Sequence, residues 1–292
     1  ATYSFGGPWV EKNIFAHRML FALMTSMAVA FNHDEPRWLR LFAFPFIPVS
    51  LIIILTAGSA TVLVLSIISI LVMVSVWLIW SGLRTVQHAR SMGVCAILFG
   101  LGTVLLLIAN SGPGALAENF LGMLGKDTTL TGRTMLWEAA DRIVKERPWL
   151  GVGAEGFWMW GRGDANTLLE LSHKAPGVRF SFHNSYYEVQ VHLGYVGLVS
   201  MVGIVLWAGS NSLLGWLRSQ DLARSFLLLI TGSTIITSFT ESTFYRVFDV
   251  GVTLVYIAAV MAVAERYRDR KPSVEPTYFG PPPGLQNRRI LE

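Results

Sequence analysis

The chain has few charged residues and only one cysteine. Charged side chains make up 14% of its 292 residues, whereas 52% are hydrophobic, and the mean hydropathy is +0.49. So few charges exclude an ordinary soluble domain and indicate a protein of the lipid bilayer. The single cysteine, Cys95, excludes an intrachain disulfide and a thiolate metal site.

Several cofactor motifs are also missing. The sequence contains no Asp-x-Asp, no His-Glu-x-x-His and no phosphate-binding loop, because Gly125-Lys126 is followed by Asp127. Residues 151–156 match G-x-G-x-x-G but follow a predicted helix and a proline instead of a strand, so they indicate a backbone turn. The net charge of +4 comes mostly from short loops and the C-terminal tail. We expect no metal, no nucleotide cofactor and no nucleic-acid partner.

What the sequence does have is long apolar runs. Residues 41–83 carry no charge and are about twice as long as one membrane span, so they predict two spans with a turn at 57–59. Further spans are predicted at 14–31, 93–110, 186–208, 225–240 and 248–264. The predicted fold class is all-α: a polytopic transmembrane helix bundle of about seven spans, with one large extracytoplasmic loop that contains short helices.

Basic residues in the short loops set the predicted orientation. They place the segments near residues 37, 84 and 218 and the tail in the cytoplasm, and the long loop outside. The predicted division is residues 1–110 with about four spans, 111–185 as the extracytoplasmic loop, 186–264 with about three spans, and 265–292 as a disordered cytoplasmic tail. The N-terminus falls outside, without Met or a signal peptide, so we expect further spans upstream.

The long loop carries the first candidate site residue. Apolar spacing predicts a helix over 133–147 with Thr131 as its N-cap, and Pro148 ends it. Arg133 would lie in its first turn, where a guanidinium can bind a diphosphate in bidentate fashion. The alternative is a solvated arginine, or one that reaches lipid headgroups.

The second candidate lies where the loop meets the next span. His183-Asn184 precedes an apolar stretch that contains Gly194 and Gly197. His183 can act as a base near neutral pH, with Asn184 orienting an acceptor, or it is an ordinary interfacial side chain. We expect the two glycines to let another helix pack closely, and His192 to be structural.

Aromatic residues follow the glycine-rich turn. Phe157-Trp158-Met159-Trp160 is typical of an interfacial anchor. The alternative is a platform on which a sugar stacks. Trp158 and Trp160 are therefore candidate substrate-binding residues.

Taken together, these elements resemble the O-antigen ligase and exopolysaccharide polymerase superfamily, also called Wzy-type proteins. The resemblance rests on Glu11-Lys12-Asn13, Gly132-Arg133, Trp137, Pro148, Gly151-x-Gly153 and, most specifically, His183-Asn184 with Gly194 and Gly197. The string Glu-Lys-Asn-Ile-Phe-Ala is nearer to the exopolysaccharide polymerase branch. The resemblance implies a multi-pass protein of the bacterial inner membrane, with the long loop in the periplasm and the C-terminus in the cytoplasm.

The resemblance also implies a reaction. The donor would be an undecaprenyl-diphosphate-linked oligosaccharide, and the acceptor another lipid-linked repeat unit for a polymerase or the lipid A core for a ligase. Arg133 would stabilise the leaving diphosphate and His183 would be the general base of a metal-independent, inverting transfer. Family members often carry a cation after a mid-chain turn, but residues 56–61 have none, which leaves Lys12, Arg162 and Arg179 as further phosphate ligands.

Two functions of another class stay open at this point. One is a transporter of lipid-linked glycans, which would need charges within its spans, and few are present. The other is a scaffold that binds polysaccharide-assembly proteins, which are also expected partners of an enzyme. Glycan transfer by the purified protein would separate the enzyme from both.

Overall fold

The computed structural model describes residues 12–82, 133–159, 161–178, 180–218, 221–246 and 248–270. Within these ranges the chain is helical and has no strand, which confirms the predicted fold class. The helices are α1 (Lys12–Phe31), α2 (Arg37–Ala43), α3 (Phe46–Ala57), α4 (Ala60–Gly82), α7 (Arg133–Glu146), α8 (Gly163–Leu171), α9 (Ser185–Arg218), α10 (Leu222–Ser238) and α11 (Val250–Arg270).

Among the described residues, four helical segments are long and apolar enough to cross a membrane: Lys12–Phe31, Arg37–Ala57, Ala60–Leu78 and Ser185–Arg218. Two shorter apolar helices are Leu222–Ser238 and Val250–Ala264. The predicted spans correspond to these helices, although α9 runs ten residues beyond the predicted end at 208. The predicted span at 93–110, the first part of the long loop and the C-terminal tail from 271 lie outside the described residues.

Local sequence explains where several helices begin and end. Gly58 closes α3 with φ of 62°, a left-handed conformation that suits glycine, so the predicted turn at 57–59 is confirmed. Asp221 caps α10 by accepting the Arg224 N–H. Asp249 caps α11 by accepting the N–H groups of Gly251 and Val252 at 2.8 and 3.2 Å. It also accepts a hydrogen bond from Arg18 of α1 at 2.7 Å, so this buried carboxylate is paired.

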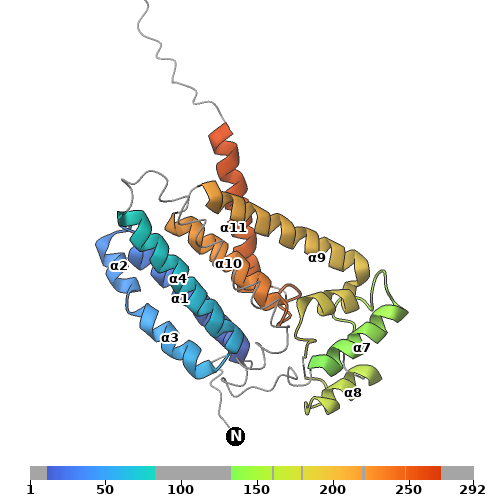
Figure 1. Cartoon of the computed structure of the whole chain (residues 1–292). Helices are drawn as coiled ribbons and strands as arrows, with labels where there is room; N and C mark the ends of the chain where they lie inside the picture. Colours follow the sequence, from blue (N-terminus) through green and yellow to red (C-terminus); the bar gives the residue numbers. More distant parts are fainter. Residues whose placement is uncertain are drawn as a thin grey trace, which may run out of the picture.

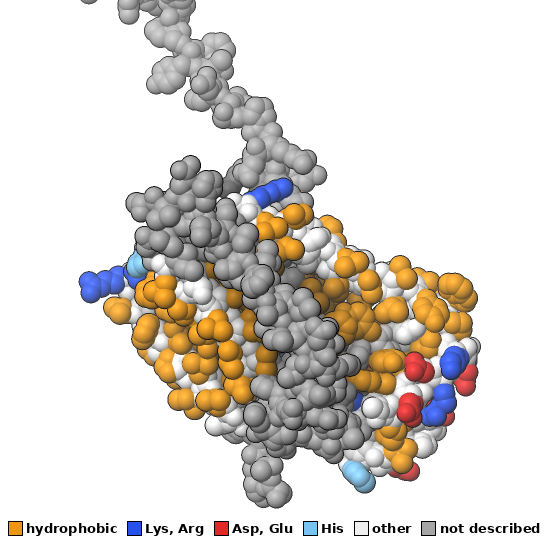
Figure 2. Space-filling model, viewed as in Figure 1, with side chains coloured by type: hydrophobic (Ala, Val, Ile, Leu, Met, Phe, Trp, Pro, Cys, Tyr) orange, Lys and Arg blue, Asp and Glu red, His pale blue; other side chains and the backbone are white. Residues whose placement is uncertain are grey.

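The helices form a bundle with two groups (Figure 1). In the first, α1 packs against α2, α3 and α4; in the second, α9, α10 and α11 pack on one another, and α10 joins the groups by contacting α1 and α4. Leu20, Met24, Ile54, Met73 and Ile230 are buried in the first core. Large apolar side chains such as Trp38, Phe42 and Ile52 are exposed, and Figure 2 shows such side chains spread over the bundle, as expected of a surface in contact with lipid.

The described part of the long loop lies at one end of the bundle, beside the first turns of α9 (Figure 1). Its own core contains Leu136 and Val144 of α7, Leu168 of α8, and Phe157 and Phe182. The α7 face that the apolar spacing predicts is the buried face, and α7 agrees with the predicted helix at 133–147. Thr131, its predicted N-cap, lies outside the described residues.

Candidate functional site

A buried carboxylate lies where the loop layer meets the bundle. Glu241 belongs to the connection between α10 and α11, and its side chain is 5% exposed. Oε1 accepts hydrogen bonds from Asn13 Nδ2 at 2.8 Å and from an Arg133 terminal nitrogen at 3.1 Å. Oε2 lies 3.2 Å from His183 Nδ1. Glu241 therefore brings together α1, α7 and the segment before α9, and these four residues are called the Glu241 cluster.

The environment of Glu241 keeps it ionised. Burial acts to raise its pKa, but the hydrogen bond and charge of His183, the charge of Arg133 and the hydrogen bond from Asn13 outweigh burial, so the pKa lies below its usual value. An ionised carboxylate can only accept hydrogen bonds. His183 must therefore donate from Nδ1, and whenever its imidazole is neutral the lone pair lies on Nε2.

The local backbone holds His183 in one conformation. His183 has φ of 50°, in the left-handed region that residues other than glycine rarely adopt. The following Asn184 caps α9: its Oδ1 accepts the N–H groups of Tyr186 and Tyr187 at 2.9 and 3.3 Å, and its Nδ2 donates to the Phe239 carbonyl at 3.1 Å. The protein thus uses both ends of the Asn184 amide.

A second pair of contacts ties the His183 segment to the Glu241 segment. Ser185 Oγ donates to the carbonyl of Glu241 at 2.9 Å and accepts the Phe244 N–H at 3.2 Å, and Ser185 is fully buried. Side-chain atoms of Asn184 and Ser185 therefore fix the backbone on both sides of Glu241. The distance between His183 and Glu241 is set by these contacts as well as by their own hydrogen bond.

Glu188 is another buried carboxylate beside the cluster, in the first turn of α9. It accepts hydrogen bonds from Trp158 Nε1 at 2.9 Å, from the Phe182 N–H at 2.7 Å and from Ser242 Oγ at 2.9 Å. It is 2% exposed, so these partners replace its lost hydration. Glu188 joins the loop aromatics, the residue before His183 and the residue after Glu241.

Arg133 keeps much of its binding capacity. It is the first residue of α7, its side chain is 16% exposed, and one terminal nitrogen binds Glu241. Its remaining guanidinium nitrogens make no hydrogen bond within the described residues. They are available to an anion that approaches the cluster.

A break in α9 lies two residues beyond His192. Gly194 has φ of 64° and ψ of −162°, outside the helical region. The turn at 148–153 hydrogen-bonds on both sides of the break: the N–H groups of Val152 and Gly153 donate to the carbonyls of Val191 and His192, and those of Tyr195 and Val196 donate to the carbonyls of Pro148 and Trp149. The broken helical bonds are thus replaced by bonds to the loop.

The expected role of Gly194 in helix packing is wrong. A Cβ on Gly194 would overlap the backbone of Trp149 and Leu150, and a Cβ on Gly197 would meet the Leu193 side chain of the same helix. The close partner of Gly194 is therefore a loop and not another helix. The predicted turn within 151–156 is confirmed, because Gly151 and Gly153 both have positive φ.

The other sequence-predicted site residues make no contact with Glu241 or lie outside the described residues. Arg162 donates to the Gly156 carbonyl at 2.8 Å and lies over the Phe157 ring. Trp158 is partly buried and packs against Phe157, Phe180 and Phe182. Lys12 begins α1, next to Asn13. Arg179 and Trp160 lie outside the described residues. His192, fully buried, stacks on Tyr245, as expected of a structural histidine.

Sequence reasoning missed Glu241, Glu188 and Asn13. A signal for Glu241 was present, because it directly follows the predicted span at 225–240, on the side of the membrane assigned to the loop.

The described residues contain no group of three His, Cys, Asp or Glu side chains that could hold a metal ion.

This chain is similar to known proteins over ranges that include part or all of the site. The family model described as O-antigen ligase matches residues 41–202, which include Arg133 and His183 and end before Glu241. The chain is 27% identical over 289 residues to the exopolysaccharide production protein ExoQ of Rhizobium meliloti (strain 1021). That match covers 97% of this chain but 64% of the relative's length.

Proposed function

The chain belongs to the O-antigen ligase family, and from this premise we propose that it transfers a glycan from an undecaprenyl-diphosphate carrier to a sugar hydroxyl at the extracytoplasmic face of the bacterial inner membrane. The observation that carries the proposal is the convergence of Asn13, Arg133 and His183 on Glu241. A base, a cation for a phosphate and a buried carboxylate are the groups that such a transfer needs.

In the proposed reaction, His183 Nε2 removes the proton of the acceptor hydroxyl. The oxygen then attacks the anomeric carbon, and the bond from that carbon to the diphosphate oxygen breaks with its electron pair leaving on the diphosphate. A single in-line displacement inverts the anomeric centre. Glu241 stabilises the imidazolium that forms, 3.2 Å from its Oε2, in the way that a buried carboxylate assists a catalytic histidine.

Arg133 is proposed to hold the diphosphate. Its guanidinium nitrogens that do not bind Glu241 can donate to phosphate oxygens, and its permanent charge stabilises the negative charge that develops on the leaving group. Lys12, beside Asn13, and Arg162 and Arg179 in the loop are proposed as further contacts for donor phosphates or sugars. Trp158 and Trp160 are proposed contacts for sugar rings.

Asn184 has a more specific proposed role than binding substrate. Because its amide caps α9 and binds the Phe239 carbonyl, we assign it to positioning His183 relative to Glu241. This differs from the expectation that Asn184 orients an acceptor, since Oδ1 already accepts two N–H groups and one Nδ2 hydrogen is donated to the Phe239 carbonyl.

Between the two acceptors, we favour polymerisation of exopolysaccharide repeat units over transfer to lipid A core. The support is the similarity to a relative named for exopolysaccharide production, because that similarity extends over 97% of this chain. A glycan product that lengthens by whole repeat units when only the lipid-linked donor is supplied would support the polymerase. Glycan that is attached only to added lipid A core would support the ligase.

The test uses the protein purified in lipid nanodiscs with an undecaprenyl-diphosphate oligosaccharide, and mass spectrometry detects the products. Longer lipid-linked glycans are expected, together with free undecaprenyl diphosphate, and a chelator should leave the rate unchanged. Movement of intact donor across the bilayer without new glycosidic bonds would support a transporter instead. Neither product nor transport, with assembly proteins still bound, would support the scaffold.

A further inference from the structure

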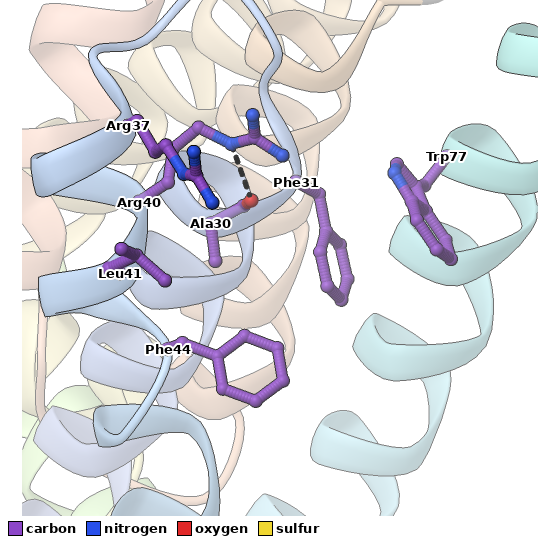
Figure 3. A pocket seen from close by; sticks show the side chains of 7 residues that line it. All are labelled: Ala30, Phe31, Arg37, Arg40, Leu41, Phe44 and Trp77. Atoms are coloured by element: carbon purple, nitrogen blue, oxygen red, sulfur yellow. Dashed lines mark hydrogen bonds between the residues drawn. The ribbon is translucent and has the colours of Figure 1, made fainter.

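A cavity lies at the end of α1 opposite the Glu241 cluster. It has a volume of about 270 Å³ and lies between the end of α1, the short helix α2 and the last part of α4. Its lining residues are Ala30, Phe31, Arg37, Arg40, Leu41, Phe44 and Trp77 (Figure 3). Asn13 and Phe31 are separated by about 27 Å along α1, at 1.5 Å per residue. The cavity is therefore distinct from the proposed glycan-transfer site.

One side of the cavity carries two guanidinium groups. Arg37 and Arg40, one turn apart on α2, lie together on the same side of the cavity (Figure 3). Arg40 Nε donates to the Ala30 carbonyl at 3.2 Å. Within the described residues neither arginine forms an ion pair, although Asp34 and Glu35 precede α2. The charge on this side of the cavity is therefore not neutralised by a described carboxylate.

The other sides are apolar and aromatic. Phe31 and Trp77 stack with their ring centroids 5.1 Å apart, while Leu41 and Phe44 are 64% and 60% exposed. The Trp77 Nε1 atom is buried and has no hydrogen-bond partner among the described residues. Because this atom is buried, it does not line the open part of the cavity. The cavity thus joins two cations and an apolar wall.

We infer that this cavity binds an anionic phospholipid, with the phosphate held by Arg37 and Arg40 and an acyl chain lying along Leu41 and Phe44. Charge complementarity selects this occupant, because a guanidinium pair matches a phosphate diester. The exposed apolar wall selects a lipid over a small anion, since inorganic phosphate would leave Leu41 and Phe44 uncovered. The predicted orientation places this end of α1 at the cytoplasmic leaflet, where basic residues attract acidic headgroups.

Native mass spectrometry of the purified, delipidated full chain tests the inference. The chain should retain phosphatidylglycerol more strongly than phosphatidylcholine with the same acyl chains. Arg37→Gln should lower phosphatidylglycerol affinity by about fivefold, the effect of about one basic contact at a membrane surface. Arg218→Gln, which removes an exposed arginine at the predicted cytoplasmic end of α9, should leave the affinity unchanged.

The apolar wall has its own variant and control. Phe44→Ala should also weaken phosphatidylglycerol binding, whereas Phe42→Ala should not, because Phe42 is equally exposed at 63% but does not line the cavity. Equal retention of the two lipids, or an Arg37→Gln variant that binds phosphatidylglycerol as tightly as the unaltered chain, would overturn the inference. Displacement of the lipid by millimolar inorganic phosphate would also overturn it, in favour of a simple anion site.

Discussion

At the scale of single residues, Glu241 determines what His183 can do. Its ionised carboxylate requires a hydrogen on Nδ1, so the basic nitrogen of His183 is Nε2, on the side of the ring away from Glu241. Because the His183 side chain is 20% exposed, a substrate hydroxyl can reach it. The same carboxylate holds one nitrogen of Arg133, so the proposed base and the proposed phosphate ligand share one partner.

Replacing the proposed base gives the first prediction. His183→Ala should lower glycan transfer by about 10²–10⁴-fold, the usual contribution of a positioned general base, while the amount of protein in the membrane stays the same. His173→Ala is the matched control, because His173 is also a loop histidine with positive φ but is exposed. Equal activity of the two variants in the mass-spectrometric assay would remove His183 from the mechanism.

The second prediction concerns the geometry of Arg133. Arg133→Lys keeps the charge but loses paired donors, and should lower transfer by at least about tenfold, since a charged hydrogen bond contributes about 1.5–3 kcal/mol. Arg142→Lys, an exposed position on the same helix, should leave the rate unchanged. If the two lysine variants transfer glycan at the same rate, Arg133 is only the first residue of a helix.

A third prediction follows from the lowered pKa of Glu241. Its folded-state pKa lies below the ordinary value of 4.5, so its ionised form stabilises the fold at neutral pH, and this contribution is lost as pH falls from about 4.5 through the folded pKa. Thermal unfolding of purified protein between pH 6 and about 3 measures the loss. Glu241→Gln should flatten this dependence and also lower transfer, because the amide cannot stabilise the imidazolium. An unchanged pH slope in the variant would show that Glu241 does not contribute.

At the scale of elements, the break at Gly194 divides α9 into two functional parts. The first, residues 185–193, carries Glu188 and His192 and belongs to the loop layer. The second, residues 195–218, is about 36 Å long at 1.5 Å per residue and is enough to span a bilayer by itself. The polar groups next to His183 thus do not have to lie in hydrocarbon.

The break yields a prediction with a natural control. Gly194→Ala forces a Cβ into a left-handed backbone and against the Trp149 backbone, and should destabilise the protein by more than about 2 kcal/mol. Gly203→Ala lies in the same helix with open space around it, and should be neutral or slightly stabilising. Thermal unfolding in detergent compares them. Similar melting temperatures for both variants would argue that the turn at 148–153 can shift without cost.

Local patterns account for the elements that the sequence predicted. The helix at 133–147 follows from apolar spacing, and the turn at 57–59 follows from small residues within an uncharged run. The Glu241 cluster depends on tertiary placement, because Asn13, Arg133 and Glu241 meet only after helices far apart in sequence have packed. Gly194 was misassigned for a related reason: a glycine within an apolar run indicates a close neighbour, but it does not say whether that neighbour is a helix or a loop.

At the scale of the whole molecule, the two ends of the bundle differ in chemistry. The Glu241 cluster and the loop layer occupy one end, whereas the cavity with Arg37 and Arg40 occupies the other (Figure 1). Figure 2 shows acidic and basic side chains together at the loop end. The positive-inside pattern predicts that the loop end faces the periplasm.

Cysteine labelling tests this orientation. In a background where Cys95 is replaced by serine, Lys174→Cys, at an exposed loop position, should react with an impermeant maleimide in intact cells. His33→Cys, exposed at the opposite end of α1, should react only after permeabilisation. The reverse pattern would place His183 in the cytoplasm and exclude a periplasmic donor.

The Glu241 cluster also bears on the order in which the protein becomes active during its synthesis. Glu241 lies 58 positions after His183 and 108 after Arg133, in the connection that precedes the last described helix. A nascent chain that has inserted α9 already carries the proposed base and phosphate ligand, but lacks the carboxylate that orients both. Under the proposed function, catalytic competence would therefore arrive late in translation, once the segment after α10 has been made, and a chain released before that point would expose the loop layer without being able to use a donor.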